Sequence, residues 1–311
     1  MAVNLKTALG PLELDHPVIN ASGTFDVLEA DTVLEEDLFA RFPFAAYVPK
    51  TVTLAPRAGN APPRLYETSA GLLNSIGLAN RGIEAFIRDD LPRLALLPVP
   101  VIASVAGEAT EDYGVCAAML DGRDELAAIE LNVSCPNVEL HGRALGLDPA
   151  GTHRAVSLAR ESTSKFLIVK LTPNVTDIVE VAAAAVDAGA DCVSLINTVH
   201  GMVLDPWSLK PVLGNVTGGL SGPAIKPVAL RAVFLVSQAV AAPVIGMGGV
   251  TSAQDALEFL AAGASAVAVG TASFRDPLAA KSVTAGLAEL MEERGIVSIP
   301  ELSGAAHQQS T

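Results

Sequence analysis

The chain has 311 residues, 50% of them hydrophobic and 17% charged, so its composition predicts a globular protein with a well-filled core rather than a disordered chain. The formal net charge is −14 and Lys and Arg do not cluster, which argues against a nucleic-acid partner. No apolar run reaches the roughly 18 residues of a membrane span, and the N-terminus lacks targeting features, so we expect a cytoplasmic protein with no membrane partner.

Short β-branched runs recur along the whole chain, and each predicts a strand: PVIN (17–20), AAYVPK (45–50), VPVIASV (99–105), AAIELNV (127–133), FLIVKL (166–171), CVSLIN (192–197), APVIGM (242–247) and AVAVG (266–270). Helical patterns separate most of these runs, at residues 111–122, 148–162, 175–190, 223–240 and 252–264. This alternation predicts an α/β fold, a (β/α)8 TIM barrel that forms a single domain over residues 1–311. The alternative is an open doubly wound sheet, which usually carries an early GxGxxG turn, and the sequence has none.

Two connections are longer than a helix requires. Residues 52–80 and 198–221 are rich in Gly, Pro and Asn, and both follow predicted strand ends. Barrel enzymes build their sites at the C-terminal face of the strands, so we interpret both insertions as long loops that cover a pocket there. Surface decoration is the alternative. We expect the tail, residues 303–311, to be loose.

Polar side chains follow the predicted strands where each hydrophobic run ends. Lys50 and Lys170 supply two cations, while Asn132 and Asn197 supply amides. A single such lysine could simply extend its ammonium group to solvent, but the repetition at one topological position favours a polar pocket floor. Amides match a ring edge of alternating N–H and C=O groups, and lysines balance an anion.

Glycines follow the seventh and eighth predicted strands, in GMGGV (246–250) and VGTAS (269–273). Loops at these positions of a barrel often present backbone N–H groups to a phosphate, because glycine lets the backbone approach closely. The alternative is that these glycines only make tight turns.

Cys135 lies just past a predicted strand end, between Ser134 and Pro136. A thiol can act as a general base or nucleophile when its thiolate is stabilised. We interpret Cys116 and Cys192 instead as small buried hydrophobic residues. We expect no metal site, since the five histidines are scattered and no CxxC or HExxH motif occurs.

Several segments together resemble dihydroorotate dehydrogenase, and more narrowly the catalytic subunit of the class 1B enzymes. They are NASGTF, PKTVT with PR nearby, NSIGLAN, IELNVSCPN, VKLTPNVTD, INTVHG, GGLSGPAIKP, IGMGGV and AVAVGTA, in this order between about residues 17 and 276. The resemblance implies an FMN-containing barrel that oxidises (S)-dihydroorotate to orotate in pyrimidine biosynthesis.

Carried over position by position, the resemblance also implies roles for individual residues. Cys135 would be the catalytic base that removes the C5 proton. The substrate would be held by Lys50, Asn74, Ser75, Ile76, Gly77, Leu78, Asn132, Asn197 and Thr198. FMN would be held by Ser22, Lys50, Thr51, Asn132, Lys170, Ile196, Gly222, Gly248, Gly249, Gly270 and Thr271. Ser104 stands where the family pattern has an asparagine that contacts the flavin, so this contact could be lost or bridged by water.

Reoxidation of the flavin needs a further electron acceptor. The chain has no GxGxxG turn, too few clustered cysteines for an iron–sulfur centre, and no N-terminal membrane helix. The resemblance implies a partner subunit with FAD and a [2Fe–2S] cluster that reduces NAD⁺, around a homodimer core within a heterotetramer. Three alternatives are a homodimeric class 1A enzyme that uses fumarate, a non-redox phosphate-binding barrel, and a catalytically silent binding barrel.

Overall fold

The computed structural model describes residues 3–33, 37–134, 139–140 and 143–308. Cys135 lies outside these ranges.

An eight-stranded sheet, parallel throughout, forms the centre of the fold, in the order β3-β16-β15-β12-β11-β8-β7-β4. These strands confirm the predicted TIM barrel and lie at β3 (Val18–Asn20), β4 (Val52–Thr53), β7 (Ile102–Ala106), β8 (Ala128–Asn132), β11 (Phe166–Lys170), β12 (Cys192–Leu195), β15 (Val244–Met247) and β16 (Ala266–Val269).

The barrel closes between β3 and the segment that leads into β4. The Ala45 N–H donates to the Val18 carbonyl over 2.9 Å. The Asn20 carboxamide accepts from the Val48 N–H (2.8 Å) and donates to the Val48 carbonyl (2.7 Å). Asn20 also ends a hydrophobic run, like the polar residues that were expected to face a ligand, but its amide replaces missing ladder bonds in the barrel wall. The predicted strand over residues 45–50 is reduced to a bridge between Tyr47 and Val101.

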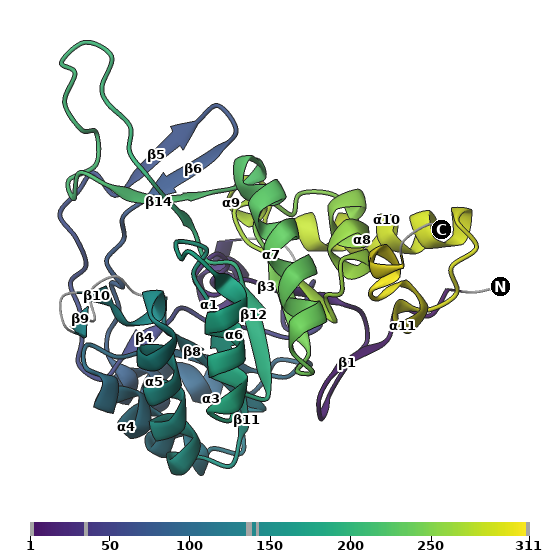
Figure 1. Ribbon diagram of the computed structural model, residues 1–311, viewed down its shortest axis with the longest axis horizontal. Coiled ribbons are helices and arrows are strands. Elements are labelled where there is room, and N and C mark those ends of the chain that lie inside the picture. The colour runs from purple at the N-terminus through teal and green to yellow at the C-terminus, as the bar shows by residue number, and fades with distance from the viewer. Residues whose placement is uncertain (1–2, 34–36, 135–138, 141–142, 309–311) are drawn as a thin grey trace.

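Helices cover the outside of the barrel (Figure 1). Side-chain caps begin several of them: Asp148 accepts from the Gly151 N–H, Asp177 accepts from the Val179 N–H, and Ser252 forms a capping box with Asp255. Among the described residues no helix is long and apolar enough to span a membrane. The helices are α1 (Val27–Val33), α2 (Ile83–Ala85), α3 (Leu91–Leu94), α4 (Thr110–Asp121), α5 (Pro149–Ser162), α6 (Ile178–Asp187), α7 (Lys226–Ala239), α8 (Ala253–Ala261), α9 (Ala272–Arg275), α10 (Ala279–Glu293) and α11 (Ile299–Leu302).

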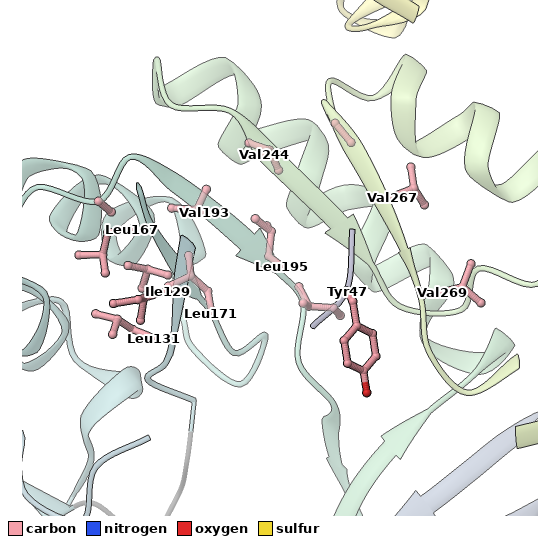
Figure 2. Packing of buried hydrophobic residues seen from close by; sticks show 14 of the residues in the cluster. Tyr47, Ile129, Leu131, Leu167, Leu171, Val193, Leu195, Val244, Val267 and Val269 are labelled. Atoms are coloured by element: carbon pink, nitrogen blue, oxygen red, sulfur yellow. The ribbon is translucent and has the colours of Figure 1, made fainter. Parts of the chain in front are cut away.

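The core has two layers because side chains alternate between the two faces of each strand. Val193, Val244 and Val267 point outward and pack against the helices, as Figure 2 shows for the larger cluster. Ile168 and Ile245 point inward and fill the barrel. Both faces of each strand are therefore buried, as expected of a parallel sheet under helices.

The two insertions pair with each other in a four-stranded antiparallel sheet, β13-β14-β6-β5, that stands apart from the barrel helices (Figure 1). The sequence predicts loops here, because Gly- and Pro-rich segments carry no local strand signal. The pairing of Gly219 with Asn74 joins residues far apart in the chain, so only the tertiary structure shows it. The strands are β5 (Leu65–Thr68), β6 (Gly71–Asn74), β13 (Val199–Gly201) and β14 (Gly218–Ser221).

The described part of the tail differs from the loose segment that we expected. The His307 ring lies 3.0 Å from the Ala262 carbonyl and packs edge-on against Phe234. Residues 309–311 lie outside the described ranges. The remaining short elements are β1 (Thr7–Leu9), β2 (Leu12–Leu14), β9 (Glu139–Leu140), β10 (Arg143–Ala144), one π-helical turn (Phe86–Asp90) and three 3₁₀ turns (Leu145–Leu147, Pro223–Ile225 and Ala305–His307).

Candidate active site

A cavity of about 680 Å³ lies between the C-terminal ends of the barrel strands and the four-stranded sheet. It is the kind of place where barrel enzymes bind their substrates. The structure brings nearly all of the predicted site residues together around it: Ser22, Lys50, Thr51, Asn74, Ser75, Ile76, Gly77, Leu78, Asn132, Lys170, Ile196, Asn197, Thr198, Gly222, Gly248, Gly249, Gly270 and Thr271.

Two predicted residues are not among those that line the cavity. Ser104 is buried in β7, and its hydroxyl lies 2.9 Å from the Thr51 hydroxyl, so Thr51 stands between it and the cavity. Cys135 is outside the described residues, although the preceding residue, Ser134, lines the cavity.

The charge of the cavity wall is opposite to that of the whole chain. Lys50 and Lys170 line it, and no Asp or Glu does so among the described residues. Lys170, at the end of β11, is only 6% exposed. Within the described part of the chain its ammonium has no hydrogen bond or ion pair. A buried cation without a partner is costly, so this arrangement fits a ligand that brings negative charge.

Glycine backbone forms the wall beyond the seventh and eighth barrel strands. Gly248 and Gly249 have φ of 122° and 83°, and Gly222, beside them, has φ of 90°. These left-handed conformations favour glycine, and a Cβ at Gly249 would lie 2.7 Å from the Lys226 Cβ. The bare backbone can therefore approach a phosphate, as the sequence predicts.

Two of the amides, Asn132 and Asn197, meet in one hydrogen-bonded group. Asn197 Nδ2 donates to the Ser134 hydroxyl, which in turn donates to Asn132 Oδ1. Asn197 Oδ1 accepts from the Thr198 N–H over 2.8 Å. Asn74, on β6, donates to the Gly219 carbonyl over 3.2 Å. The barrel and the four-stranded sheet thus both contribute amides to the cavity.

The other two cysteines are poor candidates for catalysis. Burial raises the pKa of Cys116 to about 12. Burial also raises the pKa of Cys192, and the nearby carboxylate of Glu130 raises it further. Both thiols are free, buried and outside the cavity wall, in agreement with the sequence interpretation.

Comparison with known proteins decides the family. The dihydroorotate dehydrogenase family model matches residues 4–291. The chain belongs to the dihydroorotate dehydrogenase family. This membership confirms the resemblance seen in the sequence and shows that the chain is an oxidoreductase.

Curated relatives extend over nearly the full length of the chain. A protein of Desulforudis audaxviator is 53% identical over 308 residues, covering 99% of each chain. A protein of Geotalea uraniireducens is 49% identical over 309 residues, covering 97% of this chain and 98% of its own. Each is named dihydroorotate dehydrogenase B (NAD(+)), catalytic subunit.

Sequence reasoning missed several polar residues that line the cavity of this dihydroorotate dehydrogenase family member. Asn174 donates to the Thr198 carbonyl and accepts from the His200 N–H, and Thr172 bonds to Asn174. The signal was present, because Thr172 and Asn174 follow Lys170 in the segment KLTPN, directly after the strand end. Asn174, held by Thr172, therefore fixes the backbone carbonyl of Thr198 at the cavity wall.

Gly219→Ala is expected to lower the free energy of unfolding by about 1–3 kcal/mol, as overpacking of a tight site usually does. A Cβ at Gly219 would lie 2.0 Å from the Thr198 hydroxyl oxygen, so Thr198 or β14 must shift. Urea denaturation measures the change. Gly122→Ala is the control, because a Cβ there meets no heavy atom within 4 Å. Equal stability of the two variants would contradict the close packing of Gly219 on Thr198.

Proposed function

We propose that this chain oxidises (S)-dihydroorotate to orotate with FMN bound in the cavity, as a step of pyrimidine biosynthesis. The observation that carries the proposal is Lys170, which is nearly buried and has no partner among the described residues. It lies in a cavity wall to which none of the described Asp and Glu residues contributes. The chain is also similar over nearly its full length to relatives named for this activity.

The residues present fit FMN. The glycine backbone at Gly248, Gly249 and Gly270 suits its phosphate. Lys170 supplies a positive charge that would stabilise negative charge on the ring system of FMN. When bound, FMN would supply the acceptor for the hydride that leaves C6 of dihydroorotate.

The substrate fits the amide-rich part of the wall. Dihydroorotate carries a carboxylate and a ring with amide and imide groups. Lys50 can pair with the carboxylate, and Asn74, Asn132 and Asn197 can bond the ring. Amides held from both the barrel and the four-stranded sheet would fix the orientation of the ring, which favours reaction.

Cys135 is our candidate for the base. In the sequence it directly follows Ser134, which lines the cavity. As a thiolate it would take the proton from C5 while a hydride leaves C6. The two hydrogens leave as H⁺ and H⁻, and the product, orotate, gains one C=C bond.

We propose that the electrons pass to a partner subunit that carries FAD and a [2Fe–2S] cluster and reduces NAD⁺, in an assembly with two copies of each chain. The names of the relatives, which give NAD(+) and a catalytic subunit, support a partner of this kind. The sequence has no dinucleotide turn of its own and few cysteines for a cluster.

An absorbance spectrum of the purified chain tests the proposal. We expect flavin absorbance that bleaches on anaerobic addition of dihydroorotate and stays bleached when NAD⁺ is then added without a partner. Colourless protein that cannot be loaded with FMN would contradict the function and favour a non-redox barrel. Fast reoxidation by fumarate would contradict the partner and favour a homodimeric fumarate-dependent enzyme, and fast reduction of NAD⁺ by the chain alone would also contradict it.

A further inference from the structure

A buried carboxylate lies beneath the cavity floor. Glu130 is 3% exposed and precedes Asn132 by two residues on β8, so both side chains point into the barrel. Glu130 does not line the cavity, and the proposed chemistry leaves it without a role. A buried carboxylate is expensive unless its oxygens receive hydrogen bonds.

Two serine hydroxyls supply those bonds. Ser104, on the neighbouring β7, donates to Glu130 Oε1 over 3.1 Å. Ser194, on β12, donates to Glu130 Oε2 over 3.0 Å. A carboxylate can only accept hydrogen bonds, so the hydroxyl hydrogens of Ser104 and Ser194 both point toward Glu130.

The donation from Ser104 to Glu130 also limits the hydrogen bonds that Thr51 can make. The Ser104 and Thr51 hydroxyl oxygens are 2.9 Å apart. The single hydrogen of Ser104 is already committed to Glu130. That of Ser22, whose oxygen lies 3.0 Å from the Thr51 hydroxyl, goes to the Pro49 carbonyl (2.8 Å). Thr51 therefore donates its own hydrogen to one of these two serines. The Thr51 oxygen is then left as an acceptor only, and Asn132 Nδ2 lies 3.4 Å from it.

The same direction fixes the two amides of the cavity wall. Asn132 turns its Nδ2 toward Thr51, and its Oδ1 accepts from Ser134 over 2.5 Å. Asn197 Nδ2 donates to Ser134, and its Oδ1 is taken by the Thr198 N–H. Each amide therefore keeps one N–H for a ligand, while each amide oxygen already accepts one hydrogen bond from the protein.

We propose that Glu130 is a positioning residue that, through Ser104 and Thr51, holds the Asn132 amide so that it offers N–H to the bound pyrimidine. The identity of the ligand rests on the proposed function. The chemistry agrees, since the ring carbonyls and the carboxylate of orotate are acceptors. Ser104 accordingly acts at the site through Thr51 rather than by touching FMN.

Orotate binding to the oxidised, FMN-loaded protein tests the proposal, read from the shift in flavin absorbance. Ser104→Ala and Glu130→Met each break the chain of hydrogen bonds, and each should weaken orotate binding about tenfold, the value of one net hydrogen bond. The double variant should be no weaker than either single variant, because both remove the same chain. Glu130→Gln should retain affinity within about twofold, since its amide oxygen can still accept from Ser104.

Ser194→Ala is the matched control. It removes the other hydroxyl from the same carboxylate but leaves the path to Thr51 intact, so orotate affinity should stay within about twofold. Equal losses in Ser194→Ala and Ser104→Ala, unchanged affinity in Glu130→Met, or additive losses in the double variant would overturn the proposal.

Failure of the proposed function can be told apart from failure of this inference. If the wild-type chain binds neither FMN nor orotate, the function is wrong. The chain of hydrogen bonds is then tested in the ligand-free protein, by comparing the unfolding free energies of the two single variants with that of the double variant. Coupling between Glu130→Met and Ser104→Ala supports it, and additivity overturns it.

Discussion

A Cys135→Ala variant is expected to oxidise dihydroorotate about 10²- to 10⁴-fold more slowly than the wild-type chain, the usual contribution of a positioned base. Orotate should still bind with little change, because Cys135 is proposed to take a proton rather than to hold the ring. Stopped-flow reduction of the FMN-loaded protein measures the first quantity, and the absorbance shift on titration with orotate measures the second.

Cys135→Ser sharpens this test. A hydroxyl is a much weaker acid than a thiol, so slight activity should remain and should rise as the pH is raised. Cys116→Ala is the control, because burial raises the pKa of that thiol to about 12 and it does not line the cavity. Near-normal oxidation by Cys135→Ala would refute the assignment of the base.

Lys170→Met should weaken FMN binding by about 10- to 100-fold, the value of a hydrogen bond to a charged group. The same change should stabilise the ligand-free protein by about 1 kcal/mol, because it removes a cation from a residue that is only 6% exposed and whose ammonium has no protein partner among the described residues. Fluorescence titration of the ligand-free protein with FMN and urea denaturation measure the two effects. Opposite signs of these effects are the signature of a residue kept for its ligand.

Lys165→Met is the matched control at the other end of the same strand. Lys165 donates to the Leu126 carbonyl over 2.9 Å, far from the C-terminal face. Its loss should leave FMN affinity within about twofold. If Lys170→Met bound FMN as tightly as Lys165→Met does, the proposed role of Lys170 would be wrong.

The barrel and most of the cavity wall could be predicted from the sequence because both depend on local patterns. Each inner strand is a short apolar run, and each ends in a residue whose direction follows from strand alternation. Lys170 and Asn132 were therefore placed correctly from their position after a hydrophobic run. Asn20 satisfies the same pattern, but its amide closes the barrel, because only the three-dimensional structure shows which backbone groups lack ladder partners.

Other features depend on contacts between distant segments. The pairing of β6 with β14 has no local signal, since GGLS is a weak strand former. Glu130 looks unremarkable in the run AAIELNV, and its importance lies in Ser104 and Ser194, which two other strands bring to it. Ser104 looked like a weakened flavin contact, whereas the structure shows it bonded to Thr51 and Glu130.

The sheet made by the two insertions has a consequence for how this chain can change over time. Asn74 on β6 and Gly219 on β14 sit opposite each other, and Gly222 follows the end of β14 directly. Deleting one residue from either strand would shift this pairing by a single step, and a deletion in β6 before Asn74 would also turn its side chain to the opposite side. Insertions or deletions in one of these two segments are therefore tolerated only with a matching change in the other, so the two segments must evolve together although they lie far apart in the sequence.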